Sequence, residues 1–204
     1  TGMGRDGAQG LKKMKEAGCY YVSFGVESVN ETVLKNISKG ITIKQVTDVM
    51  GWCKELNIKT KVFFSFGHIG ETWKYSMETF DFIDKHAKYI DNMAVSLGVR
   101  IYPGTQVESY AKENGLIPND FSWSAPFTGI KNDFLHDDSV PLIIQPSHGI
   151  KELRKCYYRM YLSEIRKALK EKHGIIKKIK NIRSFPDLIS KIYKFIKLAG
   201  NLFK

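Results

Sequence analysis

An alternation of strand-like and helix-like segments constrains the fold of this chain more than any other feature. Runs rich in aromatic and β-branched residues, which favour strands, begin near positions 19, 58 and 92. The stretches between these runs have apolar residues at helical spacing and open with helix-capping signals. Strands that alternate with helices in this way usually pair in parallel. The sequence therefore predicts an α/β fold with a parallel sheet.

Local signals set the expected limits of each element. The predicted strands are 19–24, 58–66 and 92–101, and the predicted helices are 8–17, 28–37, 42–56, 71–86, 105–115 and 149–172. The apolar residues 62–64 predict that the second strand is buried on both faces. Ser28 is the predicted cap of the second helix, because Glu31 follows it at capping-box spacing. Residues 118–147 contain four prolines and predict an ordered, loop-rich segment.

The composition excludes several classes of protein. Apolar residues make up 43% and charged residues 26% of the 204 residues, which is typical of a globular chain and not of a disordered or collagen-like one. No apolar run approaches the roughly 18 residues of a membrane-spanning helix, and the first residues contain no signal-peptide core. The three cysteines are scattered and odd in number, which argues against a disulfide framework and favours the reducing cytoplasm.

The positive charge is concentrated at the C-terminal end. Residues 164–204 carry +9 of the net charge of +11, so the rest of the chain is nearly neutral and an extended nucleic-acid groove is not expected there. Within this end, residues 175–182 and 186–198 predict two basic amphipathic helices in the tail 174–204. Their apolar faces could dock on the main domain, or could lie in an anionic membrane surface. Specific nucleic-acid binding is not expected, because aromatic residues are few and not interleaved with the lysines.

Candidate binding residues follow the predicted strands, because sites in parallel β/α folds form at the carboxyl ends of strands. Glu27 comes directly after an apolar strand, where its two oxygens could accept from both hydroxyls of a ribose or could pair with a lysine or arginine. His68, in a glycine-rich turn, is more typical of a solvated loop than of a ligand. Glu71 could simply occupy the first turn of the next helix, where the helix dipole favours it.

Four stretches of the chain resemble the radical S-adenosylmethionine (SAM) superfamily, and their order and spacing match. They are residues 14–28, 33–40, 63–72, and 102–105 together with 110–117. The resemblance is closest to the subgroup that usually carries an upstream cobalamin-binding domain. It implies a partial (β/α) barrel with parallel strands, the second half of a radical SAM-type barrel, followed by a mostly helical C-terminal extension. The implied divisions are 1–117 for the half barrel, 118–147 for the connecting segment and 148–204 for the basic helical extension.

The same resemblance implies cofactor-binding roles for residues at the strand ends. Glu27 matches the position that contacts the ribose of SAM, and residues 67–70 match the turn whose backbone meets the adenine. Glu71 would brace that turn, and Arg100 would face the site from the third strand. The predicted set is Glu27, Ser28, Gly67, His68, Ile69, Gly70, Glu71 and Arg100. The family commonly has Gly-Leu-Pro-Gly-Glu in this turn, so His68 and Ile69 are departures from its pattern.

The family binds its [4Fe–4S] cluster through Cys-x3-Cys-x2-Cys, and this chain has no such motif. Its cysteines, Cys19, Cys53 and Cys156, are separated by 34 and 103 positions. The cluster ligands, and any cobalamin-binding domain, are therefore expected upstream of Thr1, and no metal ligand or catalytic residue is assigned within the chain. The implied function is that of a fragment of a radical SAM enzyme, which cleaves SAM reductively at the cluster to start radical chemistry on an unknown substrate.

Two other functions are compatible with parts of the sequence. One is a non-catalytic scaffold whose basic tail contacts an anionic membrane surface or nucleic acid. The other is a different (β/α) barrel enzyme such as an aldolase, which the lack of a lysine at any predicted strand end disfavours.

Overall fold

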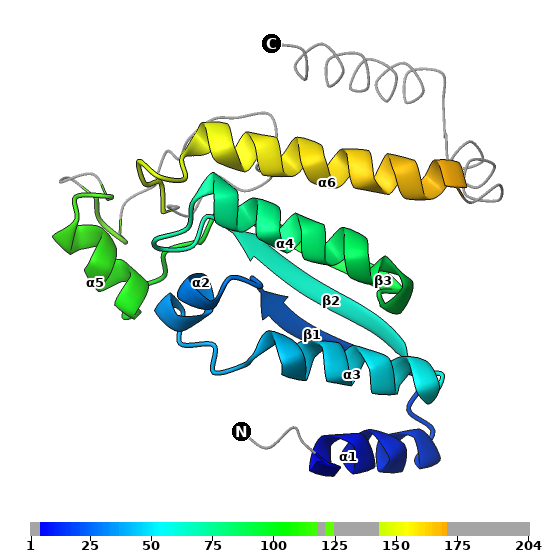
Figure 1. The fold of residues 1–204 in the computed structure, drawn as a ribbon. Helices are drawn as coiled ribbons and strands as arrows, with labels where there is room; N and C mark the ends of the chain where they lie inside the picture. Colours follow the sequence, from blue (N-terminus) through cyan, green and yellow to red (C-terminus); the bar gives the residue numbers. More distant parts are fainter. Residues whose placement is uncertain (1–4, 118–120, 125–142, 171–204) are drawn as a thin grey trace. The chain divides into compact units, whose positions relative to one another are not determined.

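The computed structural model describes residues 5–117, 121–124 and 143–170 (Figure 1). The strands are β1 (Tyr21–Glu27), β2 (Lys59–Phe66) and β3 (Asn92–Leu97). The helices are α1 (Arg5–Glu16), α2 (Glu31–Asn36), α3 (Ile43–Glu55), α4 (Trp73–His86), α5 (Gln106–Glu113) and α6 (Ile150–Lys170), with a short 3₁₀ helix η1 (Ala87–Tyr89). The chain divides into two compact units, Thr1–Leu153 and Arg154–Lys204, and all of the contacts discussed below lie within the first.

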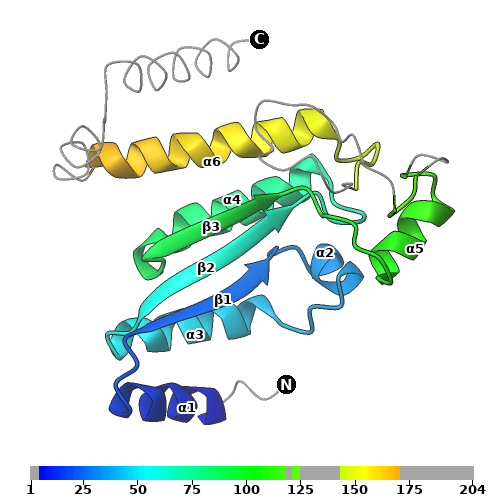
Figure 2. The same ribbon diagram turned by 180° about the vertical axis from the view of Figure 1, so that it is seen from behind.

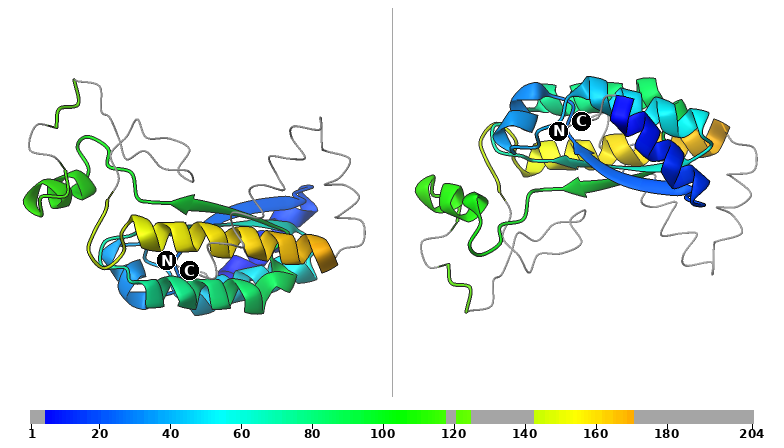
Figure 3. Two further views of the ribbon diagram at one scale, coloured as in Figure 1. Left: turned by 90° about the horizontal axis from the view of Figure 1, so that it is seen from above. Right: turned by 90° about the horizontal axis from the view of Figure 1, so that it is seen from below.

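The three strands form one parallel sheet in the order β1-β2-β3. In its register Gly25 of β1 lies opposite Phe63 of β2, which lies opposite Ala94 of β3. Helices α3 and α4 lie on the same side of this sheet, as the views from above and below show (Figure 3). The prediction of an α/β fold with parallel strands joined by helices is confirmed.

Alternate residues of β2 have opposite environments. Val62, Phe64 and Phe66 are buried, and the ring of Phe66 stacks on that of Phe80 in α4 with 4.6 Å between ring centroids. Phe63 faces the other side and is 36% exposed. Among the described residues no helix covers that side of the sheet, which faces the viewer in Figure 2. The prediction that this strand is buried on both faces is therefore wrong.

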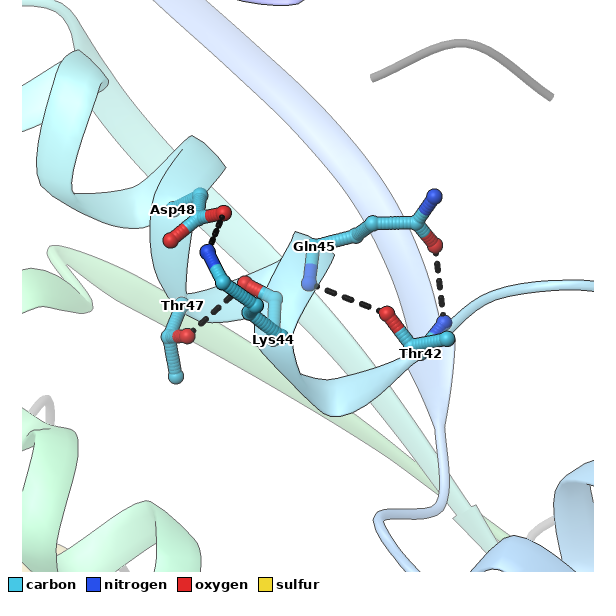
Figure 4. Close-up of polar contacts among 5 residues, drawn as sticks. All are labelled: Thr42, Lys44, Gln45, Thr47 and Asp48. Carbon is cyan, nitrogen blue, oxygen red and sulfur yellow. Dashed lines mark hydrogen bonds and ion pairs between the residues drawn. The ribbon is translucent and has the colours of Figure 1, made fainter. Parts of the chain in front are cut away.

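Capping residues determine where the helices begin. In α3, Thr42 accepts a hydrogen bond from the backbone of Gln45, and the Gln45 side chain accepts one from the backbone of Thr42, so the predicted capping box is confirmed (Figure 4). The cap of α2, in contrast, is Asn30 and not Ser28. The Ser28 hydroxyl instead accepts from the backbone N–H of Asn30 and lies 3.4 Å from the Thr79 hydroxyl of α4. Ser28 is fully buried next to Thr79, so it does not cap the helix.

Helix α4 begins two residues later than predicted, because Thr72 is its cap and accepts from the backbone N–H of Tyr75. This limit leaves Glu71 outside the helix, in the turn after β2. Strand β3 ends at Leu97, earlier than predicted, and β1 continues to Glu27. The basic helices predicted within 174–204 and most of the segment 118–147 lie outside the described residues. None of the helices in the described part of the chain has an apolar stretch long enough to cross a membrane.

Candidate functional site

A hollow of about 500 Å³ lies on the uncovered side of the sheet, toward the carboxyl ends of the strands. Its volume falls within the range of small-molecule sites. All three strands and the loop after α2 contribute to its lining. The lining residues are Gly25, Glu27, Lys39, Phe63, Phe64, Ala94, Val95 and Ser96. The hollow therefore combines an aromatic ring and small side chains with one oppositely charged pair.

Glu27, at the end of β1, is placed by an irregularity in the strand. The pairing of β1 with β2 shifts register between Gly25 and Glu27, and Glu27 adopts a φ of +66°. This left-handed conformation is uncommon for a residue other than glycine, and strained backbone of this kind is enriched at functional sites. With this backbone, the Glu27 side chain folds back over Gly25. A Cβ atom at position 25 would therefore collide with Glu27 Oε1. The glycine is thus required by the position of the carboxylate.

The Glu27 carboxylate has two polar partners on the open side of the sheet. Lys39 Nζ lies 3.1 Å from Oε1, and the Ser65 hydroxyl donates to Oε2 at 2.6 Å. The Glu27 and Lys39 side chains are 26% and 30% exposed, so this ion pair is reached by water. An ionised carboxylate can accept about four hydrogen bonds. The pairing with a lysine and the binding of ligand hydroxyls, considered as alternatives from the sequence, are therefore compatible.

Glu71 organises the turn 67–71 that follows β2. Its side chain is fully buried, and Oε2 accepts from the backbone N–H groups of Gly67 at 2.7 Å and His68 at 3.0 Å. Its Oε1 accepts from the Ser76 hydroxyl at 2.7 Å. Burial raises the pKa of Glu71, while the hydrogen bonds from Ser76 and the two backbone groups act in the opposite direction.

A segment about 75 residues further along the chain binds the same turn. Gln145 Oε1 accepts from the backbone N–H of Gly70 at 3.1 Å, and Gln145 Nε2 donates to the carbonyl of His68. The Ser147 hydroxyl donates to the carbonyl of Glu71 at 3.0 Å. From another direction, Asn36 at the end of α2 donates to the carbonyl of Ile69 at 2.9 Å. The N–H groups of residues 67, 68 and 70 are all bound within the protein.

His68 is buried, with 8% of its surface exposed, so its interpretation as a solvated loop residue is wrong. Its Nε2 lies 2.8 Å from the Ser65 hydroxyl, and Ser65 in turn binds Glu27. Desolvation lowers the pKa of His68 to about 4, against the opposite effect of Glu27, with His148 and Lys39 lowering it further. The imidazole is therefore neutral at pH 7.

The structure brings some of the predicted residues together at the hollow and leaves others out of its lining. Glu27 lines the hollow, and His68 and the rest of the turn connect to it through Ser65. Ser28 is buried against α4, and neither it nor Arg100 is among the lining residues. The binding roles of the whole set stay predictions. Several residues at the site were not predicted, because only tertiary contacts bring them there: Lys39, Phe63, Ser65, Ser96, Gln145, Ser147 and His148.

The described cysteines do not fit a cluster site. Burial raises the pKa of the Cys53 thiol to about 11, with further contributions from Cys19 and Asp91. Iron–sulfur clusters are held by thiolates. In the part of the chain that the structure describes, no three His, Cys, Asp or Glu side chains are grouped so that they could hold a metal ion.

The model of the radical SAM superfamily matches residues 1–83. This part of the chain belongs to the radical SAM superfamily, and the resemblance identified from the sequence is confirmed. The match includes β1, β2, the Glu27 position and the turn 67–71.

Two curated proteins are similar to a larger part of the chain. An uncharacterized methyltransferase of Pyrococcus horikoshii is 33% identical over 169 residues, which cover 81% of this chain and 34% of that protein. The bacteriochlorophyllide d C-8(2)-methyltransferase of Chlorobaculum tepidum is 26% identical over 109 residues, covering 52% of this chain and 24% of that protein. The chain thus matches about a third and a quarter of these two relatives.

Among solved structures, the chain is similar to the radical SAM methyltransferase TsrM from Kitasatospora setae, in a structure with tryptophan substrate and the SAM analogue aza-SAM bound. The sequence identity is 25% and the TM-score is 0.47, over 52% of this chain and 20% of that one. A second structure of the same protein, with cobalamin and a [4Fe–4S] cluster bound, gives 24% identity and the same TM-score of 0.47.

Proposed function

We propose that this chain is the SAM-binding part of a radical SAM methyltransferase, in which the Glu27 carboxylate accepts hydrogen bonds from the ribose hydroxyls of SAM. The superfamily match supports a radical SAM enzyme. Methyl transfer is supported by the two curated relatives, both of which are named as methyltransferases. The substrate that receives the methyl group is not assigned.

The position of Glu27 is the observation that carries this proposal. Its carboxylate stands at the carboxyl end of β1, on the uncovered side of the sheet, and lines a hollow large enough for a nucleoside. Lys39 donates to Oε1 and Ser65 donates to Oε2, so each carboxylate oxygen can still accept a further hydrogen bond. Two adjacent acceptors match the two donors of a ribose diol. Phe63, beside the carboxylate in the hollow, offers an apolar surface for the nucleoside.

The remaining cofactors are proposed to be held outside the described residues. When bound, the [4Fe–4S] cluster supplies the electron for the reductive cleavage of SAM. The resemblance to the cobalamin-associated subgroup supports cobalamin as a further cofactor. The residues of this chain bind and orient the nucleoside and exclude water from one side of it. Three free thiols, Cys19, Cys53 and Cys156, support a cytoplasmic location.

The ribose contact is tested with a ligand pair that differs only in the diol. Adenosine and 2′,3′-dideoxyadenosine are titrated into the chain and into the Glu27→Gln variant by calorimetry. We expect the substitution to weaken adenosine binding by about 1–3 kcal/mol, the cost of losing charge-assisted hydrogen bonds. The dideoxy compound should bind both proteins equally weakly, because it cannot use the carboxylate.

The matched control is Glu55→Gln, which removes the same charge at an exposed position of α3. It should leave both affinities unchanged. Equal losses for the two ligands in Glu27→Gln, or no loss for either, would contradict the assignment of the carboxylate to the ribose.

A further inference from the structure

Two chains of hydrogen bonds with the same order of side chains, histidine to serine to glutamate, meet at the turn 67–71. In the first hydrogen-bonded series, His68 Nε2 lies 2.8 Å from Ser65 Oγ, and Ser65 Oγ lies 2.6 Å from Glu27 Oε2. In the second, His148 Nε2 lies 2.8 Å from Ser76 Oγ, and Ser76 Oγ lies 2.7 Å from Glu71 Oε1. The first series of hydrogen bonds ends at Glu27 in the hollow. The second ends at Glu71, which binds the backbone of the turn.

The chemistry of the groups fixes the direction of the first chain. An ionised carboxylate only accepts hydrogen bonds, so the Ser65 hydroxyl must donate its single hydrogen to Glu27. Ser65 Oγ is then an acceptor toward His68, which must carry its proton on Nε2. The imidazole is neutral because it is buried, so one tautomer, protonated at Nε2, satisfies the whole chain.

The backbone of His68 is held independently of its side chain. Its N–H donates to Glu71 Oε2 at 3.0 Å, and its carbonyl accepts from Gln145 Nε2. The imidazole is therefore fixed relative to the turn at one end and relative to Glu27 at the other. A shift of the turn moves the imidazole that donates to Ser65, so the orientation of the Ser65 hydroxyl, and with it the hydrogen bond to Glu27, depends on the position of the turn.

We propose that His68 is a positioning residue of the ribose site, which holds the Glu27 carboxylate in its binding orientation through Ser65. The identity of the ligand in this inference rests on the proposed function. The hydrogen bonds from His68 through Ser65 to Glu27 do not depend on it. It gives a role to His68, a residue that the family's common turn sequence does not have. Glu27 has a left-handed backbone conformation, and its carboxylate lies over Gly25 beside the hollow.

The first test reads the tautomer and needs no ligand. In protein labelled with ¹⁵N at histidine, the Nδ1 and Nε2 chemical shifts of His68 are measured in the chain and in Ser65→Ala. We expect the neutral, Nε2-protonated form in the unsubstituted chain, with a change of the Nε2 shift in Ser65→Ala. A His68 protonated at Nδ1, or a spectrum unaffected by Ser65→Ala, would overturn the proposal whatever the ligand is.

The second test measures the preference for adenosine over 2′,3′-dideoxyadenosine. His68→Leu removes the donor and should reduce this preference roughly 2- to 10-fold, the effect of one net hydrogen bond, without changing the affinity for the dideoxy compound. His68→Gln, whose amide can donate to Ser65, should restore most of the preference. His86→Leu is the matched control, because His86 binds the Phe82 carbonyl at the end of α4 and has no contact with this chain of residues.

The outcomes separate the two proposals. If Glu27→Gln leaves the preference unchanged, the ribose assignment fails, and the tautomer measurement still decides whether His68 holds Glu27 through Ser65. If Glu27→Gln abolishes the preference but His68→Leu and His68→Gln behave like the control, Glu27 binds the ribose without help from His68, and the positioning role is wrong.

Discussion

The carboxylate of Glu27 lies over the α-carbon of Gly25, in the space that a side chain at position 25 would fill. The two residues belong to the same strand and are separated only by Val26, which is fully buried. This arrangement depends on the register shift between them and on the left-handed backbone of Glu27. The absence of a side chain at position 25 is therefore part of the candidate site.

Gly25→Ala is expected to weaken adenosine binding much more than it lowers stability. The new methyl group meets the ends of two flexible side chains, Glu27 and Lys39, which can move away at little cost. Their movement takes the carboxylate out of the hollow. Calorimetric titration with adenosine and thermal unfolding measure the two effects on the same protein.

The matched control for this change is Gly51→Ala, in the middle of α3. A methyl group there meets no atom within 4 Å, so the substitution should stabilise the protein by roughly 0.5–1 kcal/mol through helix propensity and leave binding unchanged. Unchanged adenosine affinity in Gly25→Ala would show that the carboxylate does not need its observed position.

Gln145→Ala should loosen the turn 67–71 without unfolding the sheet. The substitution leaves the N–H of Gly70 and the carbonyl of His68 without their partner and is expected to cost about 1–3 kcal/mol. Amide hydrogen exchange measures this directly, because the Gly70 amide should exchange faster while the amides of β2 keep their protection. Gln106→Ala, at an exposed position in α5, is the control. Equal exchange at Gly70 in both variants would argue against the contact.

The stability of the protein should fall in mild acid partly through His68. Its pKa in the folded protein is lowered to about 4 from the ordinary value of 6.5, mainly by burial. Between these values the unfolded chain binds a proton that the folded chain does not, so this contribution is complete above pH 6.5 and is lost as the pH falls toward 4. Its size is at most roughly 3 kcal/mol.

Urea unfolding at pH 7 and at pH 4.5 measures this contribution in the chain and in His68→Gln. We expect a smaller loss of stability on acidification in the variant. Burial also lowers the pKa of His148, which acts in the same direction, and raises that of Glu71, which acts in the opposite one. Both groups remain in the variant, so the difference between the two proteins isolates His68. Identical losses would contradict the burial of a neutral His68.

The 204-residue chain is expected to bind no stoichiometric iron after anaerobic reconstitution. Its three cysteines lie far apart in the sequence, and Cys53 has its pKa raised to about 11, so it remains a thiol at neutral pH. Iron analysis and the visible absorption spectrum measure the result. A [4Fe–4S] spectrum from this chain would mean that its thiols converge, and would contradict the expectation that the ligands lie elsewhere.

Local sequence signals predicted the elements of the sheet. The alternation of strands and helices predicted the parallel pairing. Thr42 and Gln45 predicted the start of α3, because a capping box depends only on residues close together in the chain. The predicted cap of α2 was wrong for a tertiary reason. Ser28 and Asn30 are both good caps, and the burial of Ser28 against Thr79 decides between them.

The contacts that give the site its geometry could not be predicted. Nothing in the local sequence signals the left-handed backbone of Glu27, which arises from the register shift against β2. The link from His68 through Ser65 to Glu27 joins two strand ends and exists only once the sheet has formed. Gln145 lies in a segment without periodicity, where no pattern points to a partner.

Gln145 is synthesised about 75 residues after the turn that it binds, so the contacts of the turn form in a fixed order during synthesis. All residues of the sheet, α3 and α4 have been added once residue 97 is in place. The turn acquires its bonds from Gln145 and Ser147 only after about 50 further residues have left the ribosome. In a nascent chain the bonds of Glu71 to Gly67 and His68 precede those of Gln145 and Ser147, so the turn is completed by residues near the end of the first compact unit.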